Sequence, residues 1–358
     1  MSQQLTTRRW RGSDAPPPRP HWELLQLPGR LLTLALTPAR LLVEAVERHR
    51  IDQRLYDLLT NDARTAMMLP MVKFWGSDGL GAGLLLVHKR LFGDEERVEL
   101  SGLVFTNRDV EASASYEQPV AALDGRRVAL RASYERETDD PLLPLAGDPQ
   151  PGQGGTMSRR ELAASARLQL VGPGHLYLRS DFELTYRRLD LSVETPPAAF
   201  DRLGGLGRTS DLVEGRITVV VDSRDSPSLP TRGWLVGSEL LLTRDVHSAD
   251  LSAIRAAVNA AYHLQVLPRG RVLVLSAGGG AASPLVPGDQ LPLTGLLSLG
   301  RTYHLRGYNR DRFRARFAWW ASAEYRYPIY DIARFEFSLS SVLFVDVAGV
   351  AAEPHELA

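Results

Sequence analysis

The 358-residue sequence predicts an all-β fold, an antiparallel transmembrane β-barrel of about 13 strands, preceded by an N-terminal helical segment. From about residue 68 onward, apolar and polar residues alternate with the period of two that is typical of strands. The predicted strands are long, roughly 8 to 15 residues, and turn signals such as Asp124-Gly125 separate them. Aromatic residues gather at the predicted strand ends, where a membrane interface would hold them.

Composition excludes several other classes of protein. Apolar residues make up 44% of the chain and aromatic residues 8%, which is too many for a disordered chain. The 42 basic residues balance the 42 acidic residues, so no net positive charge points to a nucleic-acid partner. The chain has no cysteine, which excludes disulfide scaffolds, thiolate metal sites and cysteine nucleophiles. No run of 18 apolar residues predicts a transmembrane helix.

The first part of the chain differs from the rest. Residues 1–20 read as a Pro-rich leader, and residues 21–66 as a helical periplasmic segment, because their apolar residues fall at helical spacing. The stretch 37–66 has two interpretations, a brace at the periplasmic mouth of the barrel or an amphipathic helix on the membrane surface. Acidic residues beside its arginines favour the brace. No apolar segment follows the basic N-terminus, so no signal peptide is visible.

Residues 67–358 are assigned to the barrel. Long connections are expected at about 138–157, 190–210 and 283–313, with short turns on the other side, an asymmetry typical of outer-membrane barrels. A soluble β-sandwich would also alternate polar and apolar residues. The length of the strands and the many charges on their polar face favour the barrel. Gly278-Gly279-Gly280 is expected to end a strand and to give the third long connection its flexibility.

The first of two motifs lies between two predicted strands. It runs from residue 222 to residue 234, and its characteristic residues are Asp222, Arg224, Asp225, Pro230, Arg232 and Gly233. Aspartate, serine and proline favour turns, so the residues themselves indicate a structural turn in preference to a recognition or gating loop.

The second motif lies in the third long connection and is followed by two predicted strands. The connection carries Leu305-Arg306-Gly307-Tyr308, with Gly307 expected to allow a tight turn, and the strands carry Glu324 and Asp346 on their polar faces. A guanidinium group can form paired hydrogen bonds with two carboxylates, which lysine cannot do in the same geometry. The alternative is that Arg306, Glu324 and Asp346 are unrelated solvated charges.

Together and in this order, the two motifs resemble the BamA/TamA family of outer-membrane assembly barrels, and in particular its short members without POTRA repeats. The resemblance covers about residues 68–350 and is most specific over 211–350. It implies that Arg306, Glu324 and Asp346 form an ion pair between loop and barrel, and that the 222–233 motif is structural. The family usually continues beyond the Asp346 strand, so the barrel is expected to be incomplete at its C-terminus. A sheet closed by a partner is the alternative.

The resemblance also implies a function, the insertion or passage of client proteins at the bacterial outer membrane. A client strand would pair with the edge of the first strand, expected at about Met68–Gly76, where Pro70 suits an edge. The alternative is a structural or pore barrel, without insertase activity, that anchors or secretes a partner. The expected partners are the lipid bilayer and either client proteins or a separately encoded periplasmic protein, and no nucleic acid. No motif predicts an enzyme, a cofactor or a metal site.

Overall fold

The computed structural model describes most of the chain after residue 56. The described residues are 57–75, 79–93, 95–120, 126–142, 155–172, 177–193, 203–247, 250–267, 270–300, 304–308, 311–332 and 337–357. By its internal contacts the chain divides into two compact units. The larger unit comprises residues 50–326 and 342–358, and the sites discussed below belong to it.

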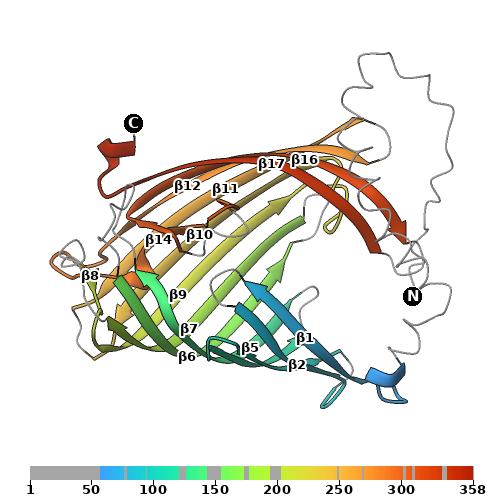
Figure 1. The fold of residues 1–358 in the computed structure, drawn as a ribbon, viewed down its shortest axis with the longest axis horizontal. Coiled ribbons are helices and arrows are strands. Elements are labelled where there is room, and N and C mark those ends of the chain that lie inside the picture. The colour runs from blue at the N-terminus through green and yellow to red at the C-terminus, as the bar shows by residue number, and fades with distance from the viewer. Residues whose placement is uncertain are drawn as a thin grey trace. The chain divides into compact units, whose positions relative to one another are not determined.

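Thirteen strands form one antiparallel sheet, which confirms the predicted all-β fold (Figure 1). Each strand pairs with the next in the order β1-β2-β3-β4-β5-β6-β7-β9-β10-β11-β12-β16-β17. Their bounds are β1 Ala66–Trp75, β2 Gly79–Lys89, β3 Arg97–Phe105, β4 Val110–Pro119, β5 Arg127–Leu142, β6 Gly155–Val171, β7 Tyr177–Val193, β9 Thr209–Asp222, β10 Gly233–Asp245, β11 Ser252–Leu267, β12 Arg271–Ser283, β16 Phe317–Ile332 and β17 Phe337–Ala351. None of the helices in the described part is long and apolar enough to cross a membrane.

The two faces of the sheet differ in chemistry, as the alternation in the sequence predicts. One face, here called the inner face, carries Glu324 and Asp346 and the loop that contains Arg306. The opposite face, here called the outer face, exposes large apolar side chains on successive strands. Leu84, Leu130, Leu162, Leu184, Leu275 and Val345 are among them, and Leu184 is 61% exposed. A soluble sandwich covers its apolar face, whereas a membrane barrel leaves that face to lipid.

The long connections fall where the sequence predicts them. Residues 143–154 separate β5 from β6, residues 194–208 separate β7 from β9, and residues 284–316 separate β12 from β16. Because the sheet is antiparallel throughout, all three emerge at the same end of it, here called the long-loop end. The turn that carries the 222–233 motif, between β9 and β10, is at the opposite end.

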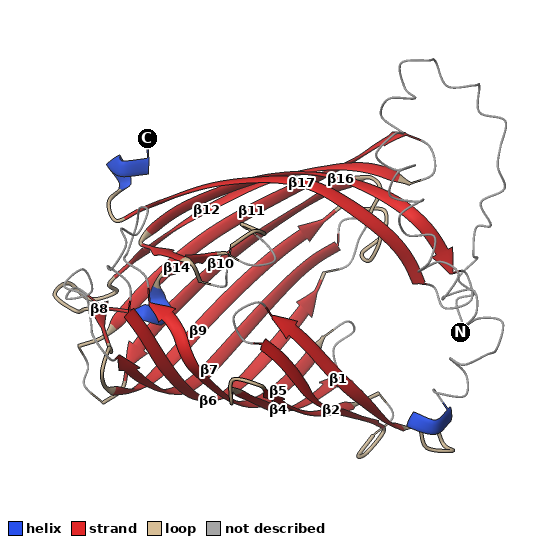
Figure 2. Ribbon diagram, in the orientation of Figure 1, coloured by secondary structure: helices blue, strands red, loops and turns tan. Residues whose placement is uncertain are grey.

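The connection from 284 to 316, here called the inner loop, has secondary structure of its own (Figure 2). Strand β13 (Leu291–Pro292) pairs in parallel with β8 (Leu203–Gly204), and β14 (Leu297–Leu299) pairs with β15 (Phe313–Ala315). A short 3-10 helix, η4 (Leu293–Gly295), lies between β13 and β14. Another, η5 (Pro354–Leu357), follows β17.

Two apolar clusters hold the inner loop on the inner face. In the first, Leu291, Leu293 and Leu296 of the loop pack with buried residues of the wall, which are Met157, Leu189, Leu191, Leu212, Leu251, Ala253 and Ala282. In the second, Leu297 and Leu299 pack with Ala318 and Trp320 of β16. The apolar core of the protein is therefore at the contact between loop and wall, and the loop is a packed part of the fold.

Three details differ from the expectations. The first strand, β1, is shifted by a residue or two from the expected Met68–Gly76. Of the expected helix over 21–66, only 57–59 is helical among the described residues. Thr60 already forms a β-bridge to Met67. The part of this segment before residue 57, like the leader 1–20, lies outside the described residues. The expectation that Gly278-Gly279-Gly280 ends a strand is wrong, because these residues lie inside β12, paired with β11 and β16.

Candidate functional site

Arg306 of the inner loop joins two strands of the inner face. Its Nε donates a hydrogen bond to Oδ2 of Asp346 at 2.9 Å, and its Nη2 donates to Oδ1 at 2.6 Å. Its Nη1 donates to Oε1 of Glu324 at 2.6 Å. One guanidinium therefore binds Asp346 on β17 through two parallel hydrogen bonds and Glu324 on β16 through a third, the geometry that the planar arginine fork favours.

Further contacts complete this cluster of Arg306, Glu324, Asp346 and Ser322, here called the arginine fork. Ser322 Oγ accepts from Arg306 Nη2 at 2.7 Å and donates to Asp346 Oδ1 at 2.6 Å. The backbone N–H of Arg306 also donates to Asp346 Oδ2, at 3.0 Å. The ring of Phe344 lies 3.8 Å from the guanidinium carbon, a cation–π contact. The Asp346 side chain is only 6% exposed, so its charge depends on these donors.

The other residues of the second motif support the loop around Arg306. Leu305 packs against the second apolar cluster. The ring of Tyr308 contacts Phe313 edge-on, with 5.1 Å between centroids. The tight turn expected at Gly307 is present, because the backbone N–H of Tyr308 donates to the Leu305 carbonyl oxygen at 3.3 Å. However, the φ of Gly307 is not positive, and a Cβ there would meet no atom within 4 Å. The local backbone therefore does not require glycine at this position.

The 222–233 motif forms a hydrogen-bonded turn, as turn chemistry predicts. Arg224 binds the Asp222 carboxylate through Nε at 2.8 Å and Nη2 at 2.7 Å. Asp225 accepts from the backbone N–H groups of Thr231 at 2.8 Å and Arg232 at 3.1 Å. Burial alone would raise the pKa of the Asp225 carboxyl group, but these hydrogen bonds outweigh burial and hold its pKa below the ordinary value.

The end of this motif is fixed by backbone geometry. Gly233 has φ +106, and a Cβ there would come within 2.5 Å of the Ser223 carbonyl oxygen. Pro230 is buried, and Arg232 Nε donates to Gln265 Oε1 on β11 at 3.1 Å. Within the described residues no hydrogen bond or ion pair joins this turn to the arginine fork, so the two motifs are separate sites.

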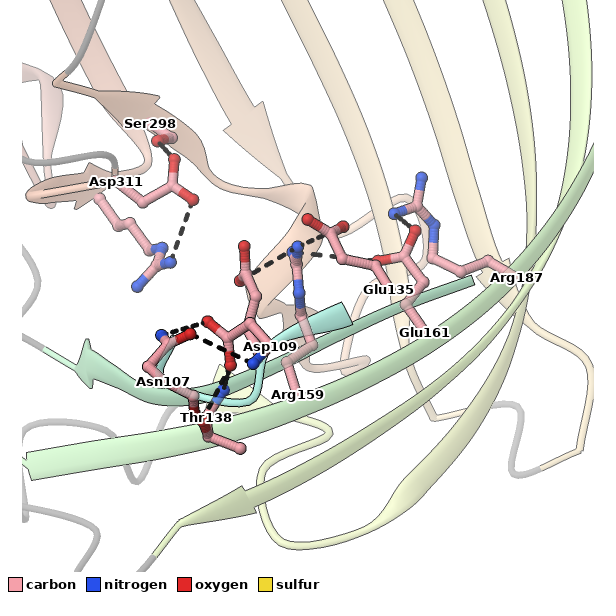
Figure 3. A network of polar contacts seen from close by, with 11 residues as sticks. Asn107, Asp109, Glu135, Thr138, Arg159, Glu161, Arg187, Ser298 and Asp311 are labelled. Atoms are coloured by element: carbon pink, nitrogen blue, oxygen red, sulfur yellow. Dashed lines mark hydrogen bonds and ion pairs between the residues drawn. The ribbon is translucent and has the colours of Figure 1, made fainter. Parts of the chain in front are cut away.

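Sequence reasoning missed a ladder of charges across the inner face (Figure 3). Arg159 on β6 binds Glu135 at 2.7 Å and Glu137 at 3.3 Å, both on β5. Arg187 on β7 binds Glu161 at 2.7 Å and Glu214 on β9 at 3.0 Å. The signal was available, since acidic and basic residues share the polar faces of these neighbouring strands, but the strand register was needed to pair them.

The ladder reaches the inner loop at Arg255 of β11. Its Nη2 donates to Glu239 Oε1 at 3.0 Å, and its Nη1 donates to the carbonyl oxygens of Thr294 at 3.3 Å and Leu296 at 3.1 Å. Near the same part of the loop, Ser298 donates to Asp311, as Figure 3 shows. The inner loop thus has a second polar attachment to the wall, distant in sequence from Arg306. In the described part of the chain, acidic and histidine side chains form no cluster that could hold a metal ion.

The comparison with protein families assigns this architecture. The model of the Omp85 superfamily domain matches residues 90–356. The chain belongs to the Omp85 superfamily. The sheet, with its apolar outer face and the loop on its inner face, is accordingly a transmembrane β-barrel of the BamA/TamA type, as the two motifs indicated.

Solved structures show the same fold at low sequence identity. BamA from Haemophilus ducreyi lacking POTRA domains 1-3 matches with a TM-score of 0.57 and 14% identity, over 80% of this chain and 57% of that one. CdiB from Escherichia coli matches with a TM-score of 0.56 and 12% identity, over 81% of this chain and 53% of that one. This chain therefore spans little more than half the length of either structure. No curated protein matches it significantly.

Proposed function

We propose that the protein works in the bacterial outer membrane as an assembly or translocation barrel, which inserts client proteins or passes them across that membrane without catalytic chemistry. Membership of the Omp85 superfamily supports the membrane location. The likeness to BamA and CdiB supports the type of barrel.

The observation that carries the proposal is the position of β1. In the described part of the chain, β2 is the only strand that pairs with β1, which is one end of the sheet; the isolated Thr60–Met67 bridge touches only the start of β1. Such an edge presents backbone N–H and C=O groups that a client strand can pair with. Pro70 lies in this strand, as suits an edge, because proline cannot donate to a ladder.

Single-cysteine variants can test this edge, because the chain has no cysteine of its own. Val72→Cys places the thiol on the outer face of β1, and Ala164→Cys is the matched control in β6, which has a strand on each side. The client probe is a small unfolded β-barrel protein with one cysteine in its last strand, added to proteoliposomes. We expect disulfide adducts at residue 72 and few at residue 164. Equal yields at the two positions would contradict the proposal.

The charged ladder on the inner face favours a second candidate function, a pore or anchor for a partner protein. A wet, charged interior suits the passage of solutes. Steady ion conductance in planar bilayers, without client adducts at residue 72, would support this second function. Against it, the inner loop packs on the same face through two apolar clusters and two polar attachments, which reduces the open cross-section.

A further inference from the structure

Along each of β5, β6 and β7, the outer face changes from apolar to basic toward the long-loop end. The change is staggered between strands, because Arg188 on β7 is directly opposite Leu162 on β6. On the short-turn side of the change, the outer face carries Leu162 and Leu184 with Tyr134 and Tyr186 at the boundary, all of them exposed. One step further toward the long-loop end, the same face carries Arg136, Arg160 and Arg188, here called the basic cluster. Tyrosines at the edge of an apolar band mark the membrane interface, so the basic cluster lies at the level of lipid headgroups.

The register brings these arginines together. Arg136 on β5 is directly opposite Arg160 on β6. Arg160 is in turn opposite Asp190 on β7, which makes Arg188, two residues before Asp190, its diagonal neighbour. Like charges directly opposite each other in a sheet are destabilising. The repulsion between Arg136 and Arg160 lowers the stability of the isolated protein. An anion bound between the arginines would offset this repulsion.

The protein itself supplies little compensation for these charges. On the inner face, the neighbouring arginines Arg159 and Arg187 both bind carboxylates within 3.0 Å. Among the described residues, none of the three outer-face arginines forms a side-chain hydrogen bond or an ion pair. Of the nearby carboxylates, Asp190 faces Arg160 without forming an ion pair.

The remaining carboxylate, Asp211, is opposite Arg188 but is already occupied. It accepts from the Tyr186 hydroxyl at 2.5 Å and lies 3.1 Å from His247 Nδ1. Even with Asp190 counted, the cluster keeps an excess of positive charge.

We propose that Arg136, Arg160 and Arg188 bind the phosphate groups of a phosphorylated lipid in the leaflet at the long-loop end of the barrel. Arginine forks match phosphate oxygens two at a time. The exposed apolar residues next to the cluster would contact the acyl chains of the same lipid; Leu162 is directly opposite Arg188, and Leu184 lies further toward the short-turn end. A water-soluble anion would gain nothing from these side chains, so the geometry favours a lipid. The proposal rests on the membrane location proposed above and not on client insertion.

A matched pair of double variants tests this site. Arg160→Gln/Arg188→Gln removes two charges from the basic cluster, and Arg131→Gln/Arg167→Gln removes two exposed arginines from the inner faces of β5 and β6. Purified proteins are mixed with a bisphosphorylated glycolipid, its dephosphorylated form or phosphatidylglycerol, and bound lipid is counted by native mass spectrometry. We expect the outer-face variant to bind both phosphorylated lipids at least tenfold more weakly, and the inner-face variant to bind as the parent does.

Two further readouts separate this site from a structural role. In lipid-free detergent, the outer-face variant should be at least as resistant to heat as the parent, because a like-charge contact is removed. When phosphorylated lipid is added, and only then, the parent should become the more heat-resistant of the two. Equal lipid binding by parent and outer-face variant would overturn the proposal. The proposal would also be overturned if the parent bound the dephosphorylated glycolipid as tightly as the bisphosphorylated one, because the site would then not recognise phosphate. Displacement of the lipid by millimolar inorganic phosphate would overturn it too, because the site would then not recognise a lipid. If the proposed membrane location were wrong, the parent protein itself would fail to insert into membranes, an outcome distinct from a loss of lipid binding in the variant.

Discussion

At Arg306 a single side chain joins the inner loop to two neighbouring strands of the sheet, β16 and β17. Asp346 receives three hydrogen bonds from Arg306 and one from Ser322, and Glu324 binds Arg306 and Arg326. The sequence predicted which three residues would meet only through its resemblance to the assembly-barrel family, because the residues by themselves left open that Arg306, Glu324 and Asp346 are unrelated solvated charges. It could not predict Ser322 or Phe344, whose roles depend on the register and on the path of the loop.

Arg306→Lys should therefore be nearly as damaging as Arg306→Ala. Lysine keeps the charge but cannot donate to both oxygens of Asp346 and to Glu324 together. Breaking a buried ion pair costs about 3–5 kcal/mol, and the partly wet site suggests a loss of about 2–3 kcal/mol in either variant. Urea unfolding followed by heat-modifiability measures this loss.

Arg316→Ala is the control for the Arg306 variants, because Arg316 pairs with Glu353 at 3.4 Å where both side chains are exposed. Exposed pairs contribute about 0–1 kcal/mol. A lysine variant as stable as the parent protein would show that charge, and not the fork geometry, holds the loop.

At the scale of elements, β12 shows where sequence reasoning fails. Three consecutive glycines resemble a flexible end of a strand, yet in the structure Gly278 and Gly280 provide room for the inner loop and its neighbours. A Cβ at Gly278 would meet the Trp320 ring at 2.6 Å, and one at Gly280 would meet Leu297 at 2.9 Å and the Ala256 carbonyl oxygen at 2.7 Å. In the sequence, glycines that make a backbone flexible look the same as glycines that let another segment pack closely against it. Only the packing partner in the structure distinguishes the two.

Gly280→Ala should displace the β14–β15 hairpin from the inner face. The carbonyl oxygen of Ala256 belongs to the backbone of β11 and cannot rotate away, so the strand or the loop must move. Overpacking of this kind costs about 1–3 kcal/mol, and trypsin should cleave after the arginines of the inner loop more quickly. Gly215→Ala on β9 is the control, since a Cβ there meets nothing within 4 Å. If both variants resist trypsin equally, the glycine does not provide room for the loop.

At the scale of the whole molecule, the period of two in the sequence determines the fold and the lipid-facing surface together. Alternation predicted the sheet, its order of hairpins and the three long connections, because each depends only on neighbours in the chain. The packing of the inner loop was not predictable in the same way. Its apolar clusters combine Leu291 and Leu297 with residues from strands far apart in sequence, and no local pattern links them.

The lipid-facing surface makes a prediction that depends on depth. Phe182 lies on the outer face of β7, midway between the outer-face residues Leu178 and Tyr186, and is 41% exposed. In a bilayer, Phe182→Arg should cost about 2–4 kcal/mol, because an arginine at the midplane must be drawn into hydrocarbon. Ser192→Arg, on the same face of β7 but beyond the basic cluster, should cost about 0–1 kcal/mol. Urea unfolding of both variants in vesicles, repeated in detergent micelles, measures the difference. The difference in cost between the two variants should be smaller in micelles, because micelles deform around a charge more easily than a bilayer does. Equal costs in vesicles would mean that the membrane lies elsewhere on the sheet.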